Sequence, residues 1–336
     1  MKNFTTAEKF GVLLTQNTGM TELDKAAEII RSGGVVAFPT ETVYGLGADA
    51  MNPMAVARIF ELKERPLFDP LIVHIADMDQ LKGLISLRDP RIYELAQAFW
   101  PGPLTMVLPK SDQVPEIVTA GLPTVGVRMP DHPIAQELIR KAGCPLAAPS
   151  ANKFGKVSPT EPWHVRKHLP DVDMILDGGK TRVGIESTVI ALRPDGFQLL
   201  RPGAVTRDDL DRILPESFDI PMMADPESPG MLASHYSPSK PFFLYTPELL
   251  SNIEPSETGF IGYKGALPAE FGEVLILSPD GDLKEYATRI FGAMHQMEAS
   301  DVKAIVVEPV PKKGIGVAIM DRLQKAAHDW KSEEGD

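Results

Sequence analysis

Two cationic side chains, Lys63 and Arg65, end an apolar helical pattern and directly precede a short apolar segment. Upstream of them, Thr40-Glu41-Thr42 leads into Tyr44-Gly-Leu-Gly47, which we interpret as a glycine-bearing turn. Hydroxyls, a carboxylate and glycines that permit close backbone approach would thus stand beside two cations. That combination suits a bound polyanion such as a nucleotide. The alternative is an ordinary solvated helix end, where cations favour the helix dipole.

Further polar side chains follow other predicted strands. Hydroxyl, amide and guanidinium groups recur at strand ends or in the loops after them, at Arg128, Ser150, Asn152, Ser158 and Arg201. Ligands of α/β proteins bind outside the ends of the strands. If these groups converge with the two cations, they form a pocket for phosphates and a carboxylate.

Other motifs do not satisfy the chemistry they resemble. Residues 177–181, Asp-Gly-Gly-Lys-Thr, resemble the end of a P-loop, but Met174 stands where that motif needs its first glycine. His164 and His168 lie four residues apart on a predicted helix, with no acid or thiol arranged beside them in the sequence. We therefore interpret them as a surface pair and predict no metal site.

Two stretches that contain histidine have two interpretations each. His74 ends an apolar segment, and it is either a satisfied core histidine or a ligand-binding group near Lys63 and Arg65. His235 and Tyr236 lie in a stretch rich in proline, serine and methionine. Their side chains are either solvated or cover a pocket.

Hydrophobic periodicity and capping signals divide the chain. They predict helices over 53–62, 90–99 and 133–142, and strands over 35–38, 71–75, 104–108, 124–128, 187–192 and 197–201. We predict four parts, namely an N-terminal extension (1–19), a catalytic domain (20–214), a linker that acts as a lid (215–240) and a smaller C-terminal domain (241–332). Strands alternate with helices in the last part, which predicts a Rossmann-like parallel α/β domain.

The composition limits the class of protein. With 336 residues, of which 43% are hydrophobic, two globular domains are expected. The formal net charge of -12 argues against a broad basic surface for nucleic acid, but not against a local basic cleft. The single cysteine, Cys144, excludes an intrachain disulfide. Because the sequence has no signal-peptide core and no long apolar run, we expect a cytoplasmic protein without a membrane partner.

Seven stretches closely resemble the YrdC-like family, in its two-domain form, the threonylcarbamoyl-AMP synthases. They are FPTETVYGLGADA, KERPLFDPLIVHI, FWPGPLTMVL, TVGVRMPDHP, LAAPSAN, GIESTVI and LRPGAV, and they cover residues 21–210 almost continuously. SPGMLASHYSP resembles the segment that joins the two domains of that family. The resemblance implies a twisted mixed sheet in a YrdC-like catalytic domain, followed by the smaller parallel α/β domain.

The resemblance also implies a reaction. ATP, L-threonine and bicarbonate or CO₂ would give L-threonylcarbamoyl-AMP and pyrophosphate. The product would supply N6-threonylcarbamoyladenosine formation next to the anticodon of tRNA. The expected ligands are therefore ATP with Mg²⁺, L-threonine and bicarbonate. The expected partners are a downstream threonylcarbamoyl-transfer machinery and, transiently, tRNA.

Carried over by motif, the resemblance assigns residues to two sides of one site. The threonine side would be lined by Thr42, His74, Arg128, Ala148 and Ser187. The nucleotide side would be lined by Lys63, Arg65, Thr124, Ser150, Asn152, Ser158 and Arg201, with His235 or Tyr236 closing over it. Asp69 stands where the family often has asparagine. Because a carboxylate cannot donate hydrogen bonds as an amide does, Asp69 would contact the nucleotide differently or face Mg²⁺.

This chemistry needs cations and positioning more than acid–base groups. A carbamate formed on the threonine amine would attack the α-phosphorus as pyrophosphate leaves, so three anionic reactants must be held together. Lys63 and Arg65 would neutralise phosphate charge, and Arg128 would hold the threonine carboxylate bidentately. One alternative is a non-catalytic YrdC-like module that binds RNA. Another is carbamoyl transfer to a different acceptor, as in hydrogenase-maturation relatives, whose acylphosphatase and zinc-finger regions this sequence lacks.

Overall fold

The computed structural model describes residues 20–194, 196–214, 235–265 and 267–330. The predicted N-terminal extension and most of the predicted linker lie outside these ranges. Within them, no helix is long and apolar enough to cross a membrane.

A mixed sheet organises the larger unit, and it has nine strands among the described residues. The strand order is β7-β1-β2-β6-β3-β5-β4-β8-β9. The pairs β1/β7, β3/β5 and β4/β8 are parallel, and the other neighbouring pairs are antiparallel. The strands are β1 (Val36–Phe38), β2 (Gly45–Asp49), β3 (Ile72–His74), β4 (Leu104–Pro109), β5 (Thr124–Arg128), β6 (Leu146–Ala147), β7 (Met174–Ile175), β8 (Thr188–Arg193) and β9 (Gly196–Arg201). The mixed sheet that the resemblance implies is thus confirmed.

Capping residues explain where the helices around this sheet begin. Asn52 accepts hydrogen bonds from two backbone N–H groups of the first turn, and Pro53 takes the first helical position. Asp77 and Asp89 cap the next two helices in the same way. The helices are α1 (Glu22–Arg31), α2 (Pro53–Lys63), α3 (Met78–Leu84), α4 (Pro90–Phe99), α5 (Glu116–Thr119), α6 (Pro133–Ala142), α7 (Pro162–His168) and α8 (Arg207–Asp211).

The stretch Tyr44–Gly47 is not the turn that we expected from its glycines. Residues Gly45–Asp49 form strand β2, which pairs antiparallel with β1. A Cβ atom on Gly47 would lie 2.6 Å from a ring carbon of Phe38. Gly47 therefore makes room for a buried aromatic ring, whereas Gly45 of the same stretch lines the cavity described below.

The smaller unit is a parallel α/β domain, as predicted. Its four-stranded sheet has the order β10-β13-β11-β12, and all neighbours are parallel. The strands are β10 (Phe242–Leu244), β11 (Thr258–Gly262), β12 (Glu273–Ile276) and β13 (Ala304–Val307). The helices are α9 (Leu283–Ala299) and α10 (Gly316–Ala326), with short 3₁₀ turns η1 (Pro247–Ser251), η2 (Pro255–Glu257) and η3 (His328–Trp330).

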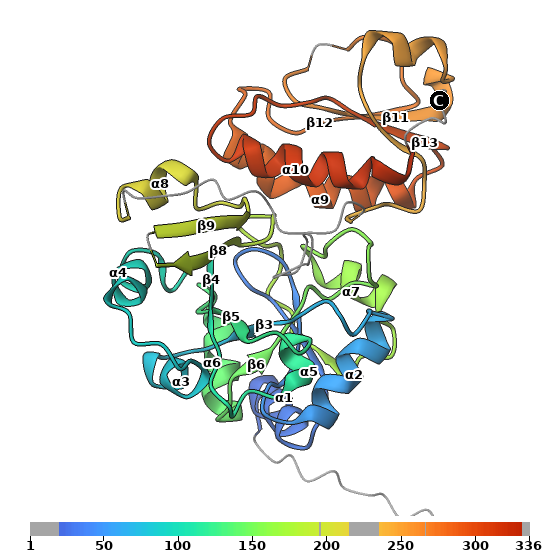
Figure 1. The fold of residues 1–336 in the computed structure, drawn as a ribbon. Helices are drawn as coiled ribbons and strands as arrows, with labels where there is room; N and C mark the ends of the chain where they lie inside the picture. Colours follow the sequence, from blue (N-terminus) through green and yellow to red (C-terminus); the bar gives the residue numbers. More distant parts are fainter. Residues whose placement is uncertain (1–19, 195, 215–234, 266, 331–336) are drawn as a thin grey trace, which may run out of the picture.

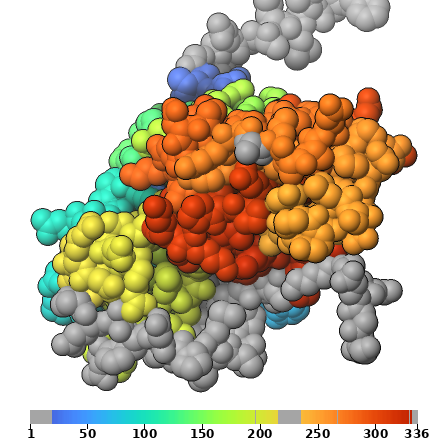
Figure 2. All heavy atoms as spheres, turned by 90° about the horizontal axis from the view of Figure 1, so that it is seen from above, coloured from blue at the N-terminus to red at the C-terminus, as the bar shows by residue number. Residues whose placement is uncertain are grey.

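The two units share a hydrophobic core. Helices α9 and α10 lie between the small sheet and the larger unit, as Figure 1 shows. Val43, Val157 and Ile185 of the larger unit belong to the same buried cluster as Ile290 and Phe291 of α9. Seen from above, the C-terminal unit (orange to red) covers much of the larger one, which remains visible along the left and upper edges (Figure 2). The described parts of the chain therefore pack as one body, with the loops at the strand ends against α9 and α10.

Candidate functional site

Loops at the strand ends of the large sheet enclose a cavity of about 50 Å³, closed on one side by His235 and Tyr236. The cavity is lined by Thr40, Thr42, Val43, Gly45, Arg65, Ile72, His74, Arg128, Ala148, Pro149, Ser150, Glu186, Ser187, Arg201, His235 and Tyr236. All the site residues predicted from the sequence are in this lining except Lys63, Asp69, Thr124, Asn152 and Ser158.

Strand pairing explains why these residues converge. Strands β3 and β5 run parallel with His74 opposite Arg128, so both strands end at the same edge. Strand β4 runs antiparallel to β5 and therefore begins at this edge. Strand β8 is parallel to β4 with Thr188 opposite Leu104, which brings the preceding Ser187 to the same place.

Lys63 packs against the wall of the cavity. Its Nζ donates hydrogen bonds to the carbonyl oxygens of Ser150 (2.6 Å) and Asn152 (2.5 Å), and the residue is 1% exposed. Burial, with a smaller contribution from the charge of Arg65, lowers the pKa of Lys63 well below its ordinary value. The interpretation of Lys63 and Arg65 as a solvated helix end is therefore wrong.

Arg65 is held by a carboxylate from its own loop. Its Nη2 lies 2.9 Å from Oδ2 of Asp69, and it also donates hydrogen bonds to the carbonyl oxygens of Asp69 and Pro70. Both members of this ion pair are buried. Burial raises the pKa of Asp69, and the charge of Arg65 opposes the rise. Asp69 is thus placed as the partner of Arg65.

Arg128 is fixed by three groups at the opposite side of the cavity. Its Nη2 lies 2.6 Å from Oε1 of Glu41, its Nη1 donates to Oγ1 of Thr42, and its Nε donates to the carbonyl oxygen of Gly102. Glu41 is 1% exposed and also accepts a hydrogen bond from the backbone N–H of Asp131. The guanidinium plane is therefore set before any ligand binds.

His74 is a neutral imidazole in this setting. Burial and, to a smaller extent, the nearby charge of Arg128 lower its pKa to about 3. The ring of Phe38 packs edge-on against it at 6.2 Å. Its Nδ1 is buried and has no hydrogen-bond partner among the described residues. His74 is thus both a buried core residue and part of the cavity lining, so the two interpretations do not exclude each other.

Arg201 and Ser187 connect the last two strands of the large sheet at the cavity. The Nη2 of Arg201 donates to Oγ of Ser187 and its Nε donates to the carbonyl oxygen of Ser187, both at 3.1 Å. Ser187 Oγ also lies 2.8 Å from Oγ1 of Thr105. Burial lowers the pKa of Arg201 from its ordinary value.

Two of the predicted residues that lie outside the lining are in different surroundings. Thr124 begins β5, at the end opposite to Arg128, and the structure does not bring it to the cavity. Asn152 donates hydrogen bonds to the carbonyl oxygens of Lys153 and Lys156. It therefore shapes the loop that receives Lys63.

Comparisons with known proteins agree over nearly the whole chain. A family model described as "Telomere recombination" matches residues 28–203, and one described as "Threonylcarbamoyl-AMP synthase, C-terminal domain" matches residues 205–328. The threonylcarbamoyl-AMP synthase of Pyrococcus abyssi is 43% identical over 321 residues, covering 90% of this chain and 93% of that protein. The protein of the same name from Bacillus subtilis is 41% identical over 327 residues, covering 93% and 94%. The chain belongs to the threonylcarbamoyl-AMP synthase family.

Solved structures of the family have the same fold. A crystal structure of Pyrococcus abyssi Sua5 complexed with L-threonine matches with a TM-score of 0.85 and 42% identity, covering 91% of this chain and 94% of that one. A variant of that protein, in which a histidine and the tyrosine after it are replaced by alanine, matches with a TM-score of 0.83 and 41% identity, covering 91% and 92%. The comparisons support an enzyme of the threonylcarbamoyl-AMP synthase family rather than an RNA-binding module.

The sequence analysis missed three charged residues of this family member. Glu41 was read only as part of a polar turn, although it pairs with Arg128. Glu186 lines the cavity, accepts a hydrogen bond from Oγ of Ser158 at 2.5 Å, and pairs with Nε of Arg322 at 2.9 Å. Arg322 lies on α10 of the second domain and is 1% exposed. No sequence signal connects residues so far apart, whereas Glu41 stood inside a motif that was already singled out.

His235 and Tyr236 are buried between the two domains, so the prediction of solvated side chains is wrong. His235 packs edge-on against Phe154 at 6.2 Å, and Tyr236 stacks on Phe291 at 5.6 Å. Tyr236 has a positive φ of 64°, an uncommon conformation for a residue other than glycine. Burial lowers the pKa of His235 well below its ordinary value and raises the pKa of Tyr236. Both residues line the cavity.

The surface pair predicted at His164 and His168 is also wrong. His164 is fully buried, and its ring stacks on that of His295 at 3.8 Å with an interplanar angle of 19°. His168 is half-buried, and its ligand atom lies near those of His295 and Glu298. The second domain supplies the acid and the third histidine, which the sequence could not place beside α7.

Proposed function

We propose that this chain forms L-threonylcarbamoyl-AMP and pyrophosphate from ATP, L-threonine and bicarbonate or CO₂. The observation that carries the proposal is the burial of Arg65, Arg128 and Arg201 around one cavity, with Lys63 against its wall. Asp69 and Glu41 hold Arg65 and Arg128 in place, and guanidinium groups placed in this way suit the phosphates of ATP and the carboxylate of threonine. The most similar relatives that we report carry the name of this enzyme.

The threonine side of the site lies around Arg128. Thr42, His74, Ala148 and Ser187 line the same cavity and would surround the amino acid. Because Nη2 of Arg128 already pairs with Glu41, a bidentate hold on the threonine carboxylate requires that Glu41 move. We propose instead that the carboxylate takes the place of the Thr42 hydroxyl at Nη1. The unpartnered Nδ1 of His74 is then available to the threonine amine or hydroxyl.

The nucleotide side lies around Arg65, Ser150 and Arg201, next to His235 and Tyr236. A cavity of about 50 Å³ cannot hold ATP, because pockets for ligands of that size are typically about 300–1,000 Å³. We propose that the His235-Tyr236 segment moves outward when ATP enters and returns to exclude water from the labile adenylate. In the Pyrococcus abyssi protein, adjacent histidine and tyrosine residues were chosen for replacement. His235-Tyr236 is the single His-Tyr pair in this sequence.

Among the described residues, the three carboxylates at or beside the cavity are all paired with arginines, so they are not available to bind Mg²⁺. Asp69 pairs with Arg65, Glu41 with Arg128 and Glu186 with Arg322. These residues therefore do not form a resident magnesium site, and the interpretation of Asp69 as a magnesium ligand does not fit its pairing. Mg²⁺ belongs to this reaction as the companion of the ATP phosphates, and we derive no step through it.

The chemistry follows from positioning. The threonine amine adds to CO₂, or to bicarbonate with loss of water, to give a carbamate. A carbamate oxygen then attacks the α-phosphorus and pyrophosphate leaves. Arg65 and Lys63 would hold the phosphates while Arg128 holds the amino acid, which converts an encounter of three reactants into a reaction within one complex. His74 keeps a low pKa, so it orients the substrate and does not act as a base near neutral pH.

Pyrophosphate release by the purified full chain tests the proposal. Release should require ATP, L-threonine and bicarbonate together. Lys63→Ala and Arg65→Ala should each lower the rate at least about tenfold, because each removes a proposed phosphate contact. Lys82→Ala is the control, since Lys82 is exposed and pairs only with Asp79 in its own helix. Release without threonine, or unchanged rates in both variants, would refute the proposal.

The product needs a consumer, because an acyl adenylate hydrolyses in water. We propose that a threonylcarbamoyl-transfer machinery uses it to form N6-threonylcarbamoyladenosine on tRNA, with at most a transient contact between tRNA and this chain. The proposed domain boundaries at residues 214 and 240, and a cytoplasmic location, stay predictions.

A further inference from the structure

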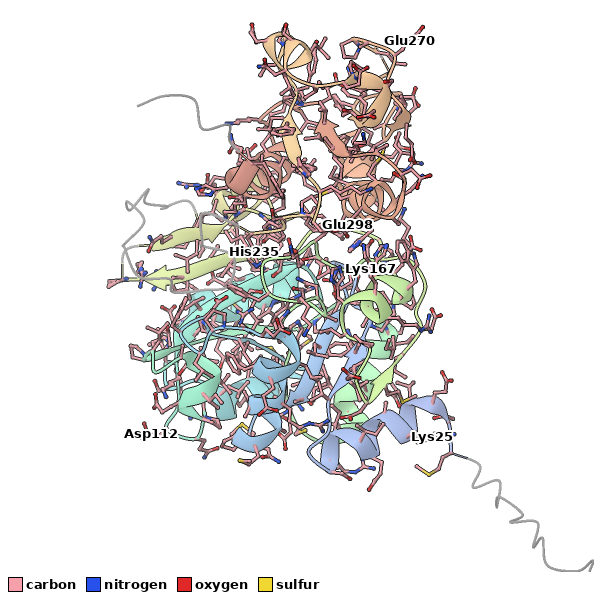
Figure 3. All side chains as sticks on the ribbon, turned by 90° about the vertical axis from the view of Figure 1, so that its right-hand side faces the viewer. Lys25, Asp112, Lys167, His235, Glu270 and Glu298 are labelled. Carbon is pink, nitrogen blue, oxygen red and sulfur yellow. The ribbon has the colours of Figure 1, made fainter. Side chains whose placement is uncertain are left out.

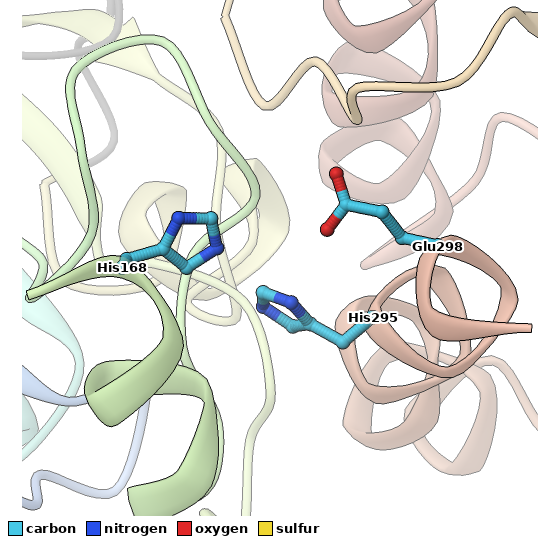
Figure 4. A group of neighbouring side chains, drawn as sticks. All are labelled: His168, His295 and Glu298. Carbon is cyan, nitrogen blue, oxygen red and sulfur yellow. The ribbon is translucent and has the colours of Figure 1, made fainter.

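Three side chains with metal-binding atoms meet at the boundary between the two domains, away from the residues that line the cavity. They are His168, at the end of α7, and His295 and Glu298, which lie on one face of α9. One ligand atom from each lies within 4.8 Å of the other two. Figure 4 shows the two imidazoles and the carboxylate facing one another from opposite sides of the boundary.

The two α9 side chains are oriented by hydrogen bonds. The Nε2 of His295 lies 3.1 Å from the carbonyl oxygen of Ser158, so it carries the hydrogen and leaves Nδ1 with a lone pair. That Nδ1 is buried without a partner in the described structure. Oε1 of Glu298 accepts hydrogen bonds from the N–H and the Oγ of Ser239. Such outer hydrogen bonds are typical of metal ligands, because they fix the tautomer and the ring or carboxylate plane.

The third ligand atom is also available. Nε2 of His168 is buried and has no partner among the described residues. His164 is not a ligand, because its Nδ1 accepts from the N–H groups of Thr160 and Glu161 and its Nε2 therefore carries the hydrogen. Its ring instead holds the plane of His295 by stacking.

We propose that His168, His295 and Glu298 form a structural site for a divalent transition-metal ion, with Zn²⁺ as the first choice, that joins the two domains. Two imidazole nitrogens and one carboxylate oxygen bind zinc in proteins with water in the fourth position, a set that is more usual in catalytic than in structural zinc sites. Bonds of about 2.0–2.2 Å to a tetrahedral ion put neighbouring ligand atoms about 3.3 Å apart. The three ligand atoms, which lie within 4.8 Å of one another, therefore have to draw closer together when the ion binds.

Lys167 places a positive charge beside one of the proposed ligands, Glu298. Its ammonium group forms a short ion pair with Oε2 of Glu298, while the Lys167 side chain is 35% exposed. Figure 3 shows Lys167 and Glu298 at the level where the two domains meet. Because the lysine stem reaches solvent, the ammonium group can swing out and leave its carboxylate oxygen to the metal. Lys167 thus competes with the metal for one ligand.

The site would couple the domain boundary to the cavity through one residue. The Ser158 carbonyl orients His295, and the Ser158 hydroxyl donates to Glu186 in the cavity lining. An ion at the boundary would hold α9 against α7 and so limit how far the second domain can move. This role is structural and requires no contact between the metal and ATP or threonine.

The test is metal binding by the full-length chain, freed of any polyhistidine tag and stripped with a chelator. Co²⁺ is the probe, because a tetrahedral site gives it strong visible absorption bands, and Zn²⁺ displacement then gives the affinity. His168→Gln and Glu298→Gln are the test variants. The matched controls are His328→Gln and Glu270→Gln, whose side chains are exposed. A further variant, Lys167→Met, removes the competing cation.

The proposal expects one Co²⁺ per chain, at least about tenfold weaker binding in both test variants, and unchanged binding in both controls. It also expects at least about threefold tighter binding in Lys167→Met, a result that stands even if His168→Gln fails to fold. No saturable Co²⁺ or Zn²⁺ binding would overturn the proposal and leave the Lys167–Glu298 ion pair as the interaction at this place in the boundary. Binding that the test variants leave intact would overturn it as well, because the ion would then sit elsewhere.

Discussion

Replacing Arg322 with methionine should destabilise the chain and change how its stability depends on pH. Arg322 is 1% exposed, pairs with Glu186 at 2.9 Å, and donates to the carbonyl oxygen of Pro202 at 2.8 Å. Methionine fills similar space without charge, so Glu186 would stay buried and lose its main partner. Removing one member of a buried pair costs about 3–5 kcal/mol. That is about two to four powers of ten in the folding equilibrium constant.

A double variant separates the pair from other effects. In Arg322→Met with Glu186→Gln neither member of this pair keeps its charge without the other, and the glutamine oxygen still accepts from Ser158. The double variant should therefore be more stable than the single Arg322→Met variant, which gives a favourable coupling energy. Arg289→Met is the control, because that arginine is 44% exposed and pairs with Glu285 on the surface of the same domain. Its expected cost is below about 1 kcal/mol.

The pH dependence has a definite sign. Burial by itself raises the pKa of Glu186, but the charges of Arg322 and Arg201 and the hydrogen bond from Ser158 lower it overall. In the parent this pair adds stability above the ordinary glutamate pKa of 4.5 and loses it as the pH falls through the lowered value. In Arg322→Met the main opposing charge is gone, so burial raises the pKa of Glu186. Protonation then relieves the buried charge, and the penalty should shrink between about pH 8 and about pH 5.

Urea unfolding, followed by tryptophan fluorescence and by circular dichroism, measures these differences. Two probes are needed because a two-domain chain can unfold in steps, and only coincident transitions give one free energy. The reasoning fails if Arg322→Met unfolds at the same midpoint as Arg289→Met. It also fails if the penalty of Arg322→Met is the same at every pH.

Two further predictions concern the ligands. Because burial depresses the pKa of Lys63, the phosphates of ATP should restore its proton, so that ATP binding takes up a proton at a pH above the depressed pKa and weakens as the pH rises. Calorimetry in buffers of different ionisation enthalpy measures this proton uptake, which should vanish in Lys63→Met. An equal uptake in Lys63→Met would contradict the assignment. His74→Ala should raise the KM for threonine at least about tenfold and change the KM for ATP by less than about twofold, because His74 lies opposite Arg128 in the pairing of β3 with β5. Initial rates of pyrophosphate release measure both constants. A larger change in the KM for ATP would place His74 on the nucleotide side.

Local signals predicted most elements of the fold. Strand Thr124–Arg128 and helix Pro133–Ala142 have the predicted bounds, because alternation, a proline at the first helical position and a following Gly143 fix them locally. Strand β2 was missed, because its glycines have low strand propensity. What places Gly45–Asp49 in the sheet is the ring of Phe38 on the neighbouring strand, a contact that no local pattern contains.

The candidate site was predictable only as a set of residue types. Motifs brought Arg65, Arg128 and Arg201 into one expected pocket, and the cavity contains all three. The sequence did not indicate that Arg65 and Arg128 would each form an ion pair with a carboxylate of the chain. Asp69 lies within one turn of Arg65 and was within reach of local reasoning. Pairing Glu41 with Arg128 requires the strand register, and that of Glu186 with Arg322 requires the second domain to be docked.

These ion pairs change how the binding of anions has to be understood. Before ligand binds, Arg65 is neutralised by Asp69 and Arg128 by Glu41, and burial favours the neutral form of Lys63. The described site is thus not a strongly positive hollow that waits for phosphates. Each ligand anion has to share a guanidinium with an acid of the chain or bring its own positive charge, as protons or as Mg²⁺ with ATP. The paired acids keep the arginines buried and oriented without ligand, but they weaken the attraction for the triphosphate alone. Arg322 of the second domain forms a further buried ion pair of this kind with Glu186.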